Sequence, residues 1–391
     1  MTRILVLTEE YKKISLPNSV CLKYIVDYLR RQGIDVDIIS AEKEVYKNTK
    51  TEYYFVEKKN NKIIYKINKL LNYPISARGK VQRYVEYVEK LLNKQRYSAI
   101  IAVQNPNETV AALKKIKEKH ADETVILYEI DPASNRYKFP KGIIQKYLMK
   151  KAKKWEIKAY RRMDYIIHMK SHMNHYRNKT YKEFEDKTRY LDIPAFRSDS
   201  SLEVNATDKK ISLIYAGAFY KKLRDPDKML KILFALTKKL PIEVKMFINA
   251  PMVEYVANKC KGKKEFDISG YISEEKLKII IKESSCLISL GNKESDFLPS
   301  KVLTYMGMEK PIIHFYYDDY DVSLLYLKKY RNAICVNLND SVDNIVSDIQ
   351  YYLKYDLNKN RLNSKELLEC FKENTPEFTA RKIIEILTSE T

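Results

Sequence analysis

The chain has 391 residues, which at roughly 100–200 residues per domain suggests two or three domains. Hydrophobic residues make up 45% of the chain and charged residues 31%, a balance typical of a globular protein, and no apolar run approaches the roughly 18 residues that cross a bilayer. Lys and Arg outnumber Asp and Glu by 72 to 51, so the net charge of +21 favours an anionic ligand or surface as partner.

Apolar strands alternate with amphipathic helices through the first half of the chain. This alternation is typical of a parallel sheet that is covered by helices on both faces. An Asn-Pro turn signal at 105–106 precedes one of the helices. The pattern predicts strands at 3–8, 34–40, 97–103, 123–131 and 164–170, and helices at 18–33, 105–120 and 143–163.

The alternation breaks at a polar stretch and then begins again. Residues 198–210 lack apolar periodicity, so we expect a linker there, between domains at 1–197 and 211–372, with a C-terminal helix at 373–391 that can pack back on the first domain. The fold class is therefore α/β, with two doubly wound Rossmann-like domains facing a cleft. In the second half we predict strands at 210–219, 242–250, 265–272, 286–292, 310–316 and 332–338, and helices at 225–240, 274–285, 341–355 and from Pro299.

A basic segment lies at the end of the first half. Between Arg136 and Arg189 there are 17 Lys and Arg against 5 Asp and Glu. Within the helix expected at 143–163, apolar residues recur at helical spacing, and most of the lysines lie off that stripe. An ordinary domain helix explains this pattern, and so does attachment to an anionic membrane surface. Zinc-finger spacing, an aromatic RNA-binding motif and a long basic tail are all missing, which argues against nucleic acid. The stripe comprises Ile144, Leu148, Ala152, Trp155, Ala159 and Met163.

The most informative motif is SLGNKESDFLPSKVLTYMGMEKPII, residues 289–313. A strand ends at Asn292, a polar loop follows, and Pro299 with Ser300 as a cap opens a helix. Free backbone N–H groups at a helix start form a site for phosphate, and Lys301 in the first turn favours a bound anion there. Thr304 lies one turn further on, on roughly the same face.

This motif resembles the donor-binding motif of bacterial glycosyltransferases of the family 4 type, which have the GT-B fold. The match to the LPSK sub-group covers Leu298 to Lys301, Tyr305-Met306 and Lys310 to Ile313. Residues 211–233 resemble the first strand and phosphate loop of the family's donor domain, and residues 266–292 resemble the segment that cups the base. Residues 126–135 resemble the place where members have an acidic residue or a His that faces the sugar, and residues 154–173 are similar to the stretch that crosses towards the acceptor side.

The chain departs from the family pattern at three places. The paired acids of the family, eight residues apart, correspond to Asp296 and Thr304, so the second acid is absent. Gly217 is followed by Ala218 instead of Arg, which leaves Arg224 as the best substitute cation for a diphosphate. The Gly-rich acceptor loop is replaced by YKKISLPNS, residues 11–19.

The resemblance implies metal-independent transfer of a hexose-like sugar from a nucleoside-diphosphate donor, with retention at the anomeric carbon. The sequence offers no carboxylate cluster for Mg²⁺, and no cofactor besides the nucleotide sugar is expected. Residues 1–197 would be the acceptor-side domain and residues 211–372 the donor domain. The implied catalytic residues are Asp131, Arg224 and Lys301, and the implied donor-binding residues are Gly217, Ala218, Gly270, Tyr271, Ile272, Asn292, Asp296, Pro299, Ser300 and Thr304.

Alternatives stay open for single residues and for the whole chain. Asp131, in an Asp-Pro pair after a strand, also suits a turn cap. His168, His172 and His175 are too few for a zinc site and are interpreted as polar helix residues. Five scattered Cys residues without a CxxC pair fit a reducing cytoplasm.

The leading hypothesis is an enzyme on the inner face of the plasma membrane that extends a lipid-linked saccharide for a surface polysaccharide. The basic helix at 143–163 would hold it to the anionic membrane. The rival hypothesis is a non-catalytic GT-B-like subunit that binds a partner enzyme or an acceptor, and a nucleotide-sugar epimerase is the third. Nucleic acid is not expected as a partner.

Overall fold

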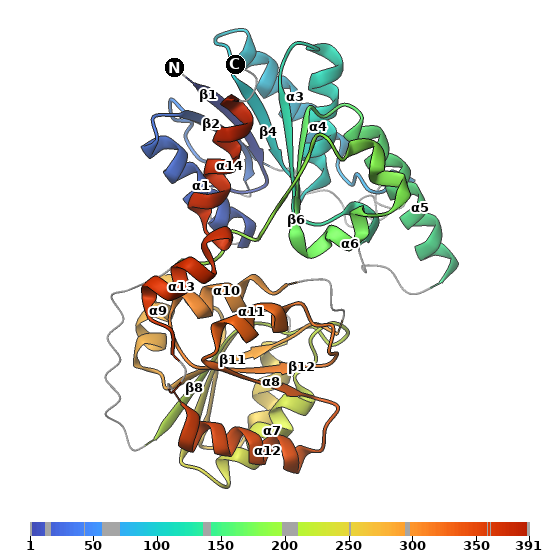
Figure 1. Cartoon of the computed structure of the whole chain (residues 1–391). Helices are drawn as coiled ribbons and strands as arrows, with labels where there is room; N and C mark the ends of the chain where they lie inside the picture. Colours follow the sequence, from blue (N-terminus) through green and yellow to red (C-terminus); the bar gives the residue numbers. More distant parts are fainter. Residues whose placement is uncertain are drawn as a thin grey trace. The chain divides into compact units, whose positions relative to one another are not determined.

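The computed structural model describes residues 2–11, 17–42, 44–56, 71–135, 142–197, 210–249, 252–293, 298–357, 359 and 361–388. The chain forms two compact units (Figure 1), one of residues 1–194 with 376–391 and one of residues 195–375. We call them the N-terminal and the C-terminal domain. Most of the expected linker, residues 198–209, lies outside the described residues.

The N-terminal domain is built on a seven-stranded parallel sheet in the order β3-β2-β1-β4-β5-β6-β7. Its strands are β1 Arg3–Thr8, β2 Asp35–Glu42, β3 Glu52–Val56, β4 Ala99–Val103, β5 Val125–Glu129, β6 Tyr165–Met169 and β7 Thr188–Leu191. Its helices are α1 Pro17–Arg31, α3 Arg78–Leu92, α4 Asn107–Lys119, α5 Ile143–Tyr160, α6 Met173–Tyr176 and α14 Pro376–Thr388, with short 3₁₀ turns at Ala133–Asn135, Lys170–His172 and Lys179–Phe184. The strands β3 and β7 and the helix α3 were not predicted.

Two cores fill the two faces of this sheet, because successive strand residues point to opposite sides. In β1, Ile4 and Val6 face α1 and α14, while Leu5 and Leu7 face α3, α4 and α5. Burial on both faces explains why these strands are continuous apolar runs. The C-terminal helix α14 packs against α1, as Figure 1 shows, and Ile383 lies in their shared core.

The basic helix differs in two respects from the helix expected at 143–163. The helix α5 ends at Tyr160, since Arg162 and Met163 close a turn on the carbonyls of Ala159 and Tyr160. In the expected apolar stripe, Ile144 is 64% exposed and Trp155 is half-buried, while the other members are buried: Leu148, Ala152, Ala159 and Met163.

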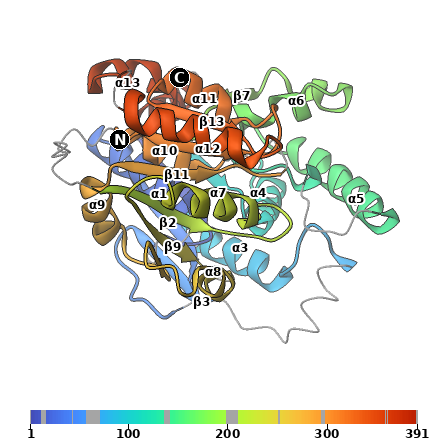
Figure 2. The same ribbon diagram turned by 90° about the horizontal axis from the view of Figure 1, so that it is seen from below.

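The C-terminal domain has a six-stranded parallel sheet in the order β10-β9-β8-β11-β12-β13. Figure 2 views its strands and helices from below. Its strands are β8 Ile211–Ala218, β9 Ile242–Asn249, β10 Phe266–Ser269, β11 Cys286–Leu290, β12 Ile312–Tyr316 and β13 Ala333–Asn337. Its helices are α7 Asp227–Thr237, α8 Val253–Cys260, α9 Glu274–Glu283, α10 Ser300–Gly307, α11 Ser323–Tyr330, α12 Val342–Tyr351 and α13 Ser364–Cys370, with a π-helical turn at Tyr352–Asp356 and a 3₁₀ turn at Lys372–Asn374.

Each sheet has one point at which the strand order reverses. In the C-terminal domain the reversal lies between β8 and β11, which are neighbours in the sheet. In open α/β sheets, ligands bind at the carboxyl ends of the strands beside such a point. A ligand site is therefore expected at the loops that follow β8 and β11.

Candidate functional site

Arg224 and Asn292 meet at the reversal point of the C-terminal sheet. The loop after β8 doubles back, because Tyr220 and Arg224 exchange two backbone hydrogen bonds of 3.1 and 2.7 Å. The guanidinium of Arg224 donates from Nη2 and Nε to Oδ1 of Asn292, at 2.8 and 3.2 Å. Asn292 directly follows the Gly at which the chain leaves β11, so two residues 68 positions apart form one polar contact.

Lys301 lies in the same cluster. It comes from the first turn of α10, and its Nζ donates to the backbone oxygen of Ala216, at 2.6 Å. Burial, together with the neighbouring charge of Arg224, lowers the pKa of this lysine to about 8. The cluster therefore places two cationic groups, one of them poorly solvated, where the resemblance requires cations for a diphosphate.

Tyr305 anchors α10 to β8 and was not predicted as a site residue. Its hydroxyl accepts from the backbone N–H of Ala216 at 2.9 Å and donates to the backbone oxygen of the same residue at 3.0 Å. Tyr305 is buried, and it lies one turn after Lys301. The position of the tyrosine in the motif could have drawn attention to it, but its partner Ala216 is 89 residues away.

The other residues expected in the motif and in the loop after β8 lie in different places and make different contacts. Ser300 is the first residue of α10 and not its cap, because Pro299 holds the cap position without a side-chain hydrogen bond. The hydroxyl of Thr304 donates to the backbone oxygen of Ser300 at 3.4 Å. Asp296 lies outside the described residues. Gly217 and Ala218 end β8, and the backbone oxygen of Ala218 accepts from Nη1 of Arg224 at 3.4 Å.

The residues expected to cup the base lie further along the same sheet edge. Gly270, Tyr271 and Ile272 follow β10, which is separated from β8 by β9. Tyr271 is 71% exposed. Among the described residues, no hydrogen bond or ion pair joins these three residues to Arg224 or Lys301.

A buried group beneath Asn292 supports the loop after β11. His314 lies on β12, where its Nδ1 is 3.1 Å from Oγ of Ser289 and its Nε2 is 3.5 Å from Oδ2 of Asp321. The other oxygen of Asp321 accepts from the backbone N–H of Ser323 at 2.8 Å. All four side chains are buried. Gly291 lies directly against Asp321, so this group determines where the adjacent Asn292 can lie.

Lys310, which belongs to the motif at residues 289–313, has a structural role. It is buried, and its Nζ donates to the backbone oxygens of Lys282 at 2.7 Å and Ser284 at 2.8 Å, at the end of α9. Burial lowers its pKa to about 8, and the charge of Arg361 contributes. The ammonium thus satisfies carbonyls that the end of a helix leaves without partners.

We expect the Lys310→Met substitution to destabilise the C-terminal domain by about 2 kcal/mol, because two backbone carbonyls lose their donor in a buried place. The measurement is urea unfolding followed by circular dichroism. Lys276→Met removes an exposed lysine of the same helix α9 that makes no contact with these carbonyls, so this control should change stability by less than about 0.5 kcal/mol. Equal stability of the Lys310→Met variant and the unchanged protein would contradict this role.

In the N-terminal domain, Asp131 follows β5 at the carboxyl edge of the sheet. Its backbone N–H donates to Oε1 of Gln104 at 3.1 Å, and its Oδ1 lies 3.4 Å from Nε2 of His172. The carboxylate is partly exposed, while His172 is buried. Asp131 therefore retains access to solvent, although one of its oxygens contacts a histidine.

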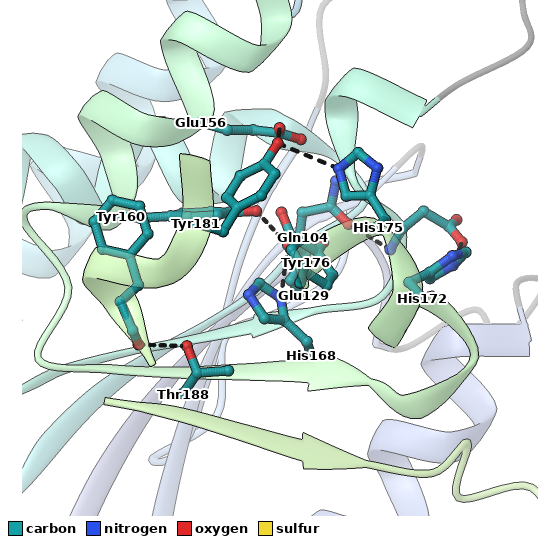
Figure 3. A network of polar contacts seen from close by, with 12 residues as sticks. Gln104, Glu129, Glu156, Tyr160, His168, His172, His175, Tyr176, Tyr181 and Thr188 are labelled. Carbon is teal, nitrogen blue, oxygen red and sulfur yellow. Dashed lines mark hydrogen bonds and ion pairs between the residues drawn. The ribbon is translucent and has the colours of Figure 1, made fainter. Parts of the chain in front are cut away.

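Figure 3 shows a buried network around Glu129, two residues before Asp131 in the chain, which was missed in the sequence. Glu129, the last residue of β5, accepts hydrogen bonds from the hydroxyls of Tyr160 and Tyr176, and its Oε2 lies 2.9 Å from Nδ1 of His168. Tyr160 belongs to α5 and His168 to β6. The network therefore links β5, α5 and β6 through Glu129, which precedes Asp131 by two residues in the sequence.

Glu156 extends this network from the basic helix. Its carboxylate accepts from the backbone N–H of Ser134 at 2.8 Å and from the hydroxyl of Tyr181 at 3.0 Å. Burial, together with the charge of Glu129, raises the pKa of Glu156 to about 7, and burial lowers the pKa of His175 to about 4. Ser134, three residues after Asp131, is thus bonded to a carboxyl group whose pKa is close to neutral pH.

The described residues contain neither a cluster of metal-ligating side chains nor a helix that could span a membrane. No group of three or more His, Cys, Asp or Glu side chains there could hold a metal ion. Among the same residues, no helix has the length and apolar character to span a membrane.

No protein-family model and no curated protein sequence matches the chain, whereas solved structures match it over nearly its whole length. Sucrose-phosphate synthase from Thermosynechococcus elongatus is 12% identical, with a TM-score of 0.70 over 100% of both chains. A UDP-forming trehalose-phosphate synthase from Burkholderia xenovorans, in complex with glucose-6-phosphate, is 7% identical, with a TM-score of 0.69 over 99% of this chain and 100% of that chain. The S. aureus MnaA–UDP structure is 11% identical, with a TM-score of 0.57 over 98% of this chain and 95% of that chain.

A likeness at this level of identity establishes the fold. The expected α/β class is confirmed: each domain is a parallel sheet flanked by helices, and the two domains match the two Rossmann-like domains of the GT-B fold in these neighbours.

Proposed function

We propose that this protein is a retaining, metal-independent glycosyltransferase. It moves a sugar from a nucleoside-diphosphate donor to a lipid-linked or oligosaccharide acceptor in the synthesis of a surface polysaccharide such as a capsule or an exopolysaccharide. The observation that carries the proposal is the meeting of Arg224, Asn292 and Lys301 at the reversal point of the C-terminal sheet. The names of two neighbours support it, since one is a UDP-forming synthase and another is a complex with UDP. We place the protein in the cytoplasm, peripherally on the inner face of the plasma membrane.

The proposed chemistry assigns charge stabilisation to the C-terminal domain. When the bond between the anomeric carbon and the diphosphate breaks, negative charge develops on the departing oxygens. Arg224, Lys301 and the free N–H groups at the start of α10 are groups that stabilise such charge. In the N-terminal domain, we assign Asp131 to the acceptor, where its partly exposed carboxylate orients the attacking hydroxyl.

The direct test is a thermal-shift screen against nucleoside diphosphates and their sugars. A ligand present at 100 times its Kd should stabilise the protein by about 2.7 kcal/mol. Stabilisation by nucleotides of one base identifies the donor, and mass spectrometry of a reaction with saccharide acceptors then detects transfer. The proposal is wrong if no nucleotide binds and no transfer occurs.

The pH dependence of nucleotide binding tests the role of Lys301. Its pKa of about 8 means that it loses its proton above pH 8 when no anion is bound. A bound diphosphate favours the ammonium and raises that pKa, so binding takes up a proton at alkaline pH and weakens as the pH rises. We expect the Kd for a nucleoside diphosphate, measured by calorimetry, to rise about tenfold between pH 7 and pH 9.

The matched control is Lys301→Arg, because a guanidinium stays protonated across this range. Its Kd should change less than about twofold between the same two pH values. If Lys301→Arg weakens with pH as strongly as the unchanged protein does, another group is responsible for the titration.

A non-catalytic GT-B-like subunit is the second candidate. The observation that favours it is Thr304, which stands where the family has its second acid and whose hydroxyl already bonds to its own helix. Such a subunit would bind a nucleotide or a partner but transfer no sugar. Binding without turnover, with donor and acceptor both present, would select this candidate.

A further inference from the structure

A groove on the N-terminal domain has an apolar floor. It lies among α3, α4, α5 and the segment before α3, and has a volume of about 670 Å³. Figure 1 shows these three helices on one side of the sheet. Tyr73, Ile75 and Val81 are buried in the floor, and half-buried Trp155 packs against the core beneath it. A hydrocarbon chain is the kind of group that gains by covering such a floor.

Five cations line the same groove. They are Arg78 of α3, Lys115 of α4, and Lys151, Lys154 and Lys158 of α5. Within the described ranges, no Asp or Glu lines the groove and none of the five forms an ion pair. Like charges gathered without counter-charges repel one another, and a bound anion relieves that repulsion.

The groove is connected to the segment that carries Asp131. The hydroxyl of Tyr73 donates to the backbone oxygen of Ala133 at 3.0 Å, two residues beyond Asp131. Tyr73 and Ala133 also share a small apolar core with Leu148 and Ala152 of α5. A molecule in the groove therefore contacts residues that position the acceptor-side loop.

The exposed start of α5 favours a membrane as the source of the ligand. Ile143, Ile144 and Tyr147 are 88, 64 and 63% exposed. They precede Lys151 by one to two turns, or about 6–12 Å along the helix axis. Large apolar side chains beside cationic ones are typical of surfaces that lie in a bilayer interface.

We propose that this groove binds the head of a single membrane lipid that carries a phosphate or diphosphate. Lys151 and Arg78 already donate to Leu71 and Asn72 of the groove, so Lys115, Lys154 and Lys158 are the cations that bind the phosphate, and the first part of the hydrocarbon chain lies against Trp155. The role of this site in sugar transfer rests on the proposed function, since a lipid-linked acceptor held here would lie beside the loop of Asp131. Lipid binding itself does not depend on transfer.

Trp155 makes the test direct, because it is the chain's only Trp. The full-length protein is titrated with phosphatidylcholine vesicles that contain or lack phosphatidic acid. We expect a blue shift of Trp155 emission with phosphatidic acid only, and quenching when its acyl chains carry bromine. Inorganic diphosphate alone should give no blue shift. An equal response to diphosphate and to vesicles would show that a free phosphate is the ligand and would overturn the proposal.

Two pairs of substitutions on α5 separate the groove from general attraction by a basic helix. Lys154→Gln with Lys158→Gln removes two cations of the groove, and should weaken binding to phosphatidic acid vesicles about thirtyfold. Lys146→Gln with Lys150→Gln removes two exposed lysines of the same helix that do not line the groove, and should weaken binding clearly less than the groove pair does, by less than about tenfold. Equal losses in the two pairs would overturn the proposal.

Nucleotide binding, measured on the same variants, separates this inference from the proposed function. Both pairs should bind nucleotides as the unchanged protein does, because Arg224 and Lys301 lie in the other domain. A protein that binds vesicles through the groove but binds no nucleotide would support the lipid site and contradict the transferase. A protein that binds nucleotides but shows no vesicle response would support the donor site and contradict the lipid site.

Discussion

Arg224→Ala should weaken the binding of a nucleoside diphosphate about a hundredfold, or about 2.7 kcal/mol. The guanidinium offers several N–H donors in one plane, two of which already point to Asn292. A departing diphosphate gains more from this charge than the bound donor does, so the transfer rate should fall by a further factor of about 100. Calorimetry gives the affinity, and single-turnover assays give the rate.

Two variants control this prediction. Arg224→Lys keeps the charge but loses the planar arrangement of donors, and should recover part of the affinity. Lys239→Ala removes one exposed positive charge next to the start of β8, at the opposite edge of the sheet, and should leave the Kd within twofold. If Arg224→Ala binds nucleotides normally and keeps its melting temperature, Arg224 does not hold the diphosphate.

Gly291→Ala should destabilise the C-terminal domain by about 3 kcal/mol, which corresponds to a melting temperature lower by about 9 °C. A Cβ atom at this position would lie 1.9 Å from Oδ2 of Asp321. That carboxylate cannot move aside freely, since it is buried between His314 and the backbone N–H of Ser323. Nucleotide binding should weaken as well, because Asn292 is the next residue. Differential scanning calorimetry measures the stability.

Gly270→Ala is the matched control, since a Cβ atom there meets no atom within 4 Å. It should change the melting temperature by less than about 2 °C. The double variant Gly291→Ala with Asp321→Ala removes the carboxylate that causes the clash, so it should lose less stability than the sum of the single variants. Strict additivity would contradict the proposed contact.

The strands that the sequence predicts correctly share one physical property, which is burial on both faces of the sheet. Residues 3–8 and 286–290 are continuous apolar runs because each strand is buried on both faces, and that pattern is independent of distant contacts. The strand β7 is only four residues long and gave no strong local signal. The helix α3, in contrast, carries Val81, Tyr84, Val85, Val88 and Leu91 at helical spacing, so its periodicity was a local signal that could have predicted it. The start of α10 was placed correctly from Pro299, but the capping role of Ser300 was wrong by one residue.

The candidate site also has features that local sequence signals predict and features that depend on contacts between distant residues. The two α/β domains followed from apolar periodicity, and the candidate cations Arg224 and Lys301 followed from the motif and its surroundings, because both kinds of signal are local. Which of these side chains meet depends on the folded chain, since Arg224 and Asn292 are far apart in the sequence and become neighbours through the strand order. Parallel strands bring together the ends of distant segments, and for the same reason the network of Glu129, Glu156 and His168 could not be recognised before folding placed β5, α5 and β6 side by side.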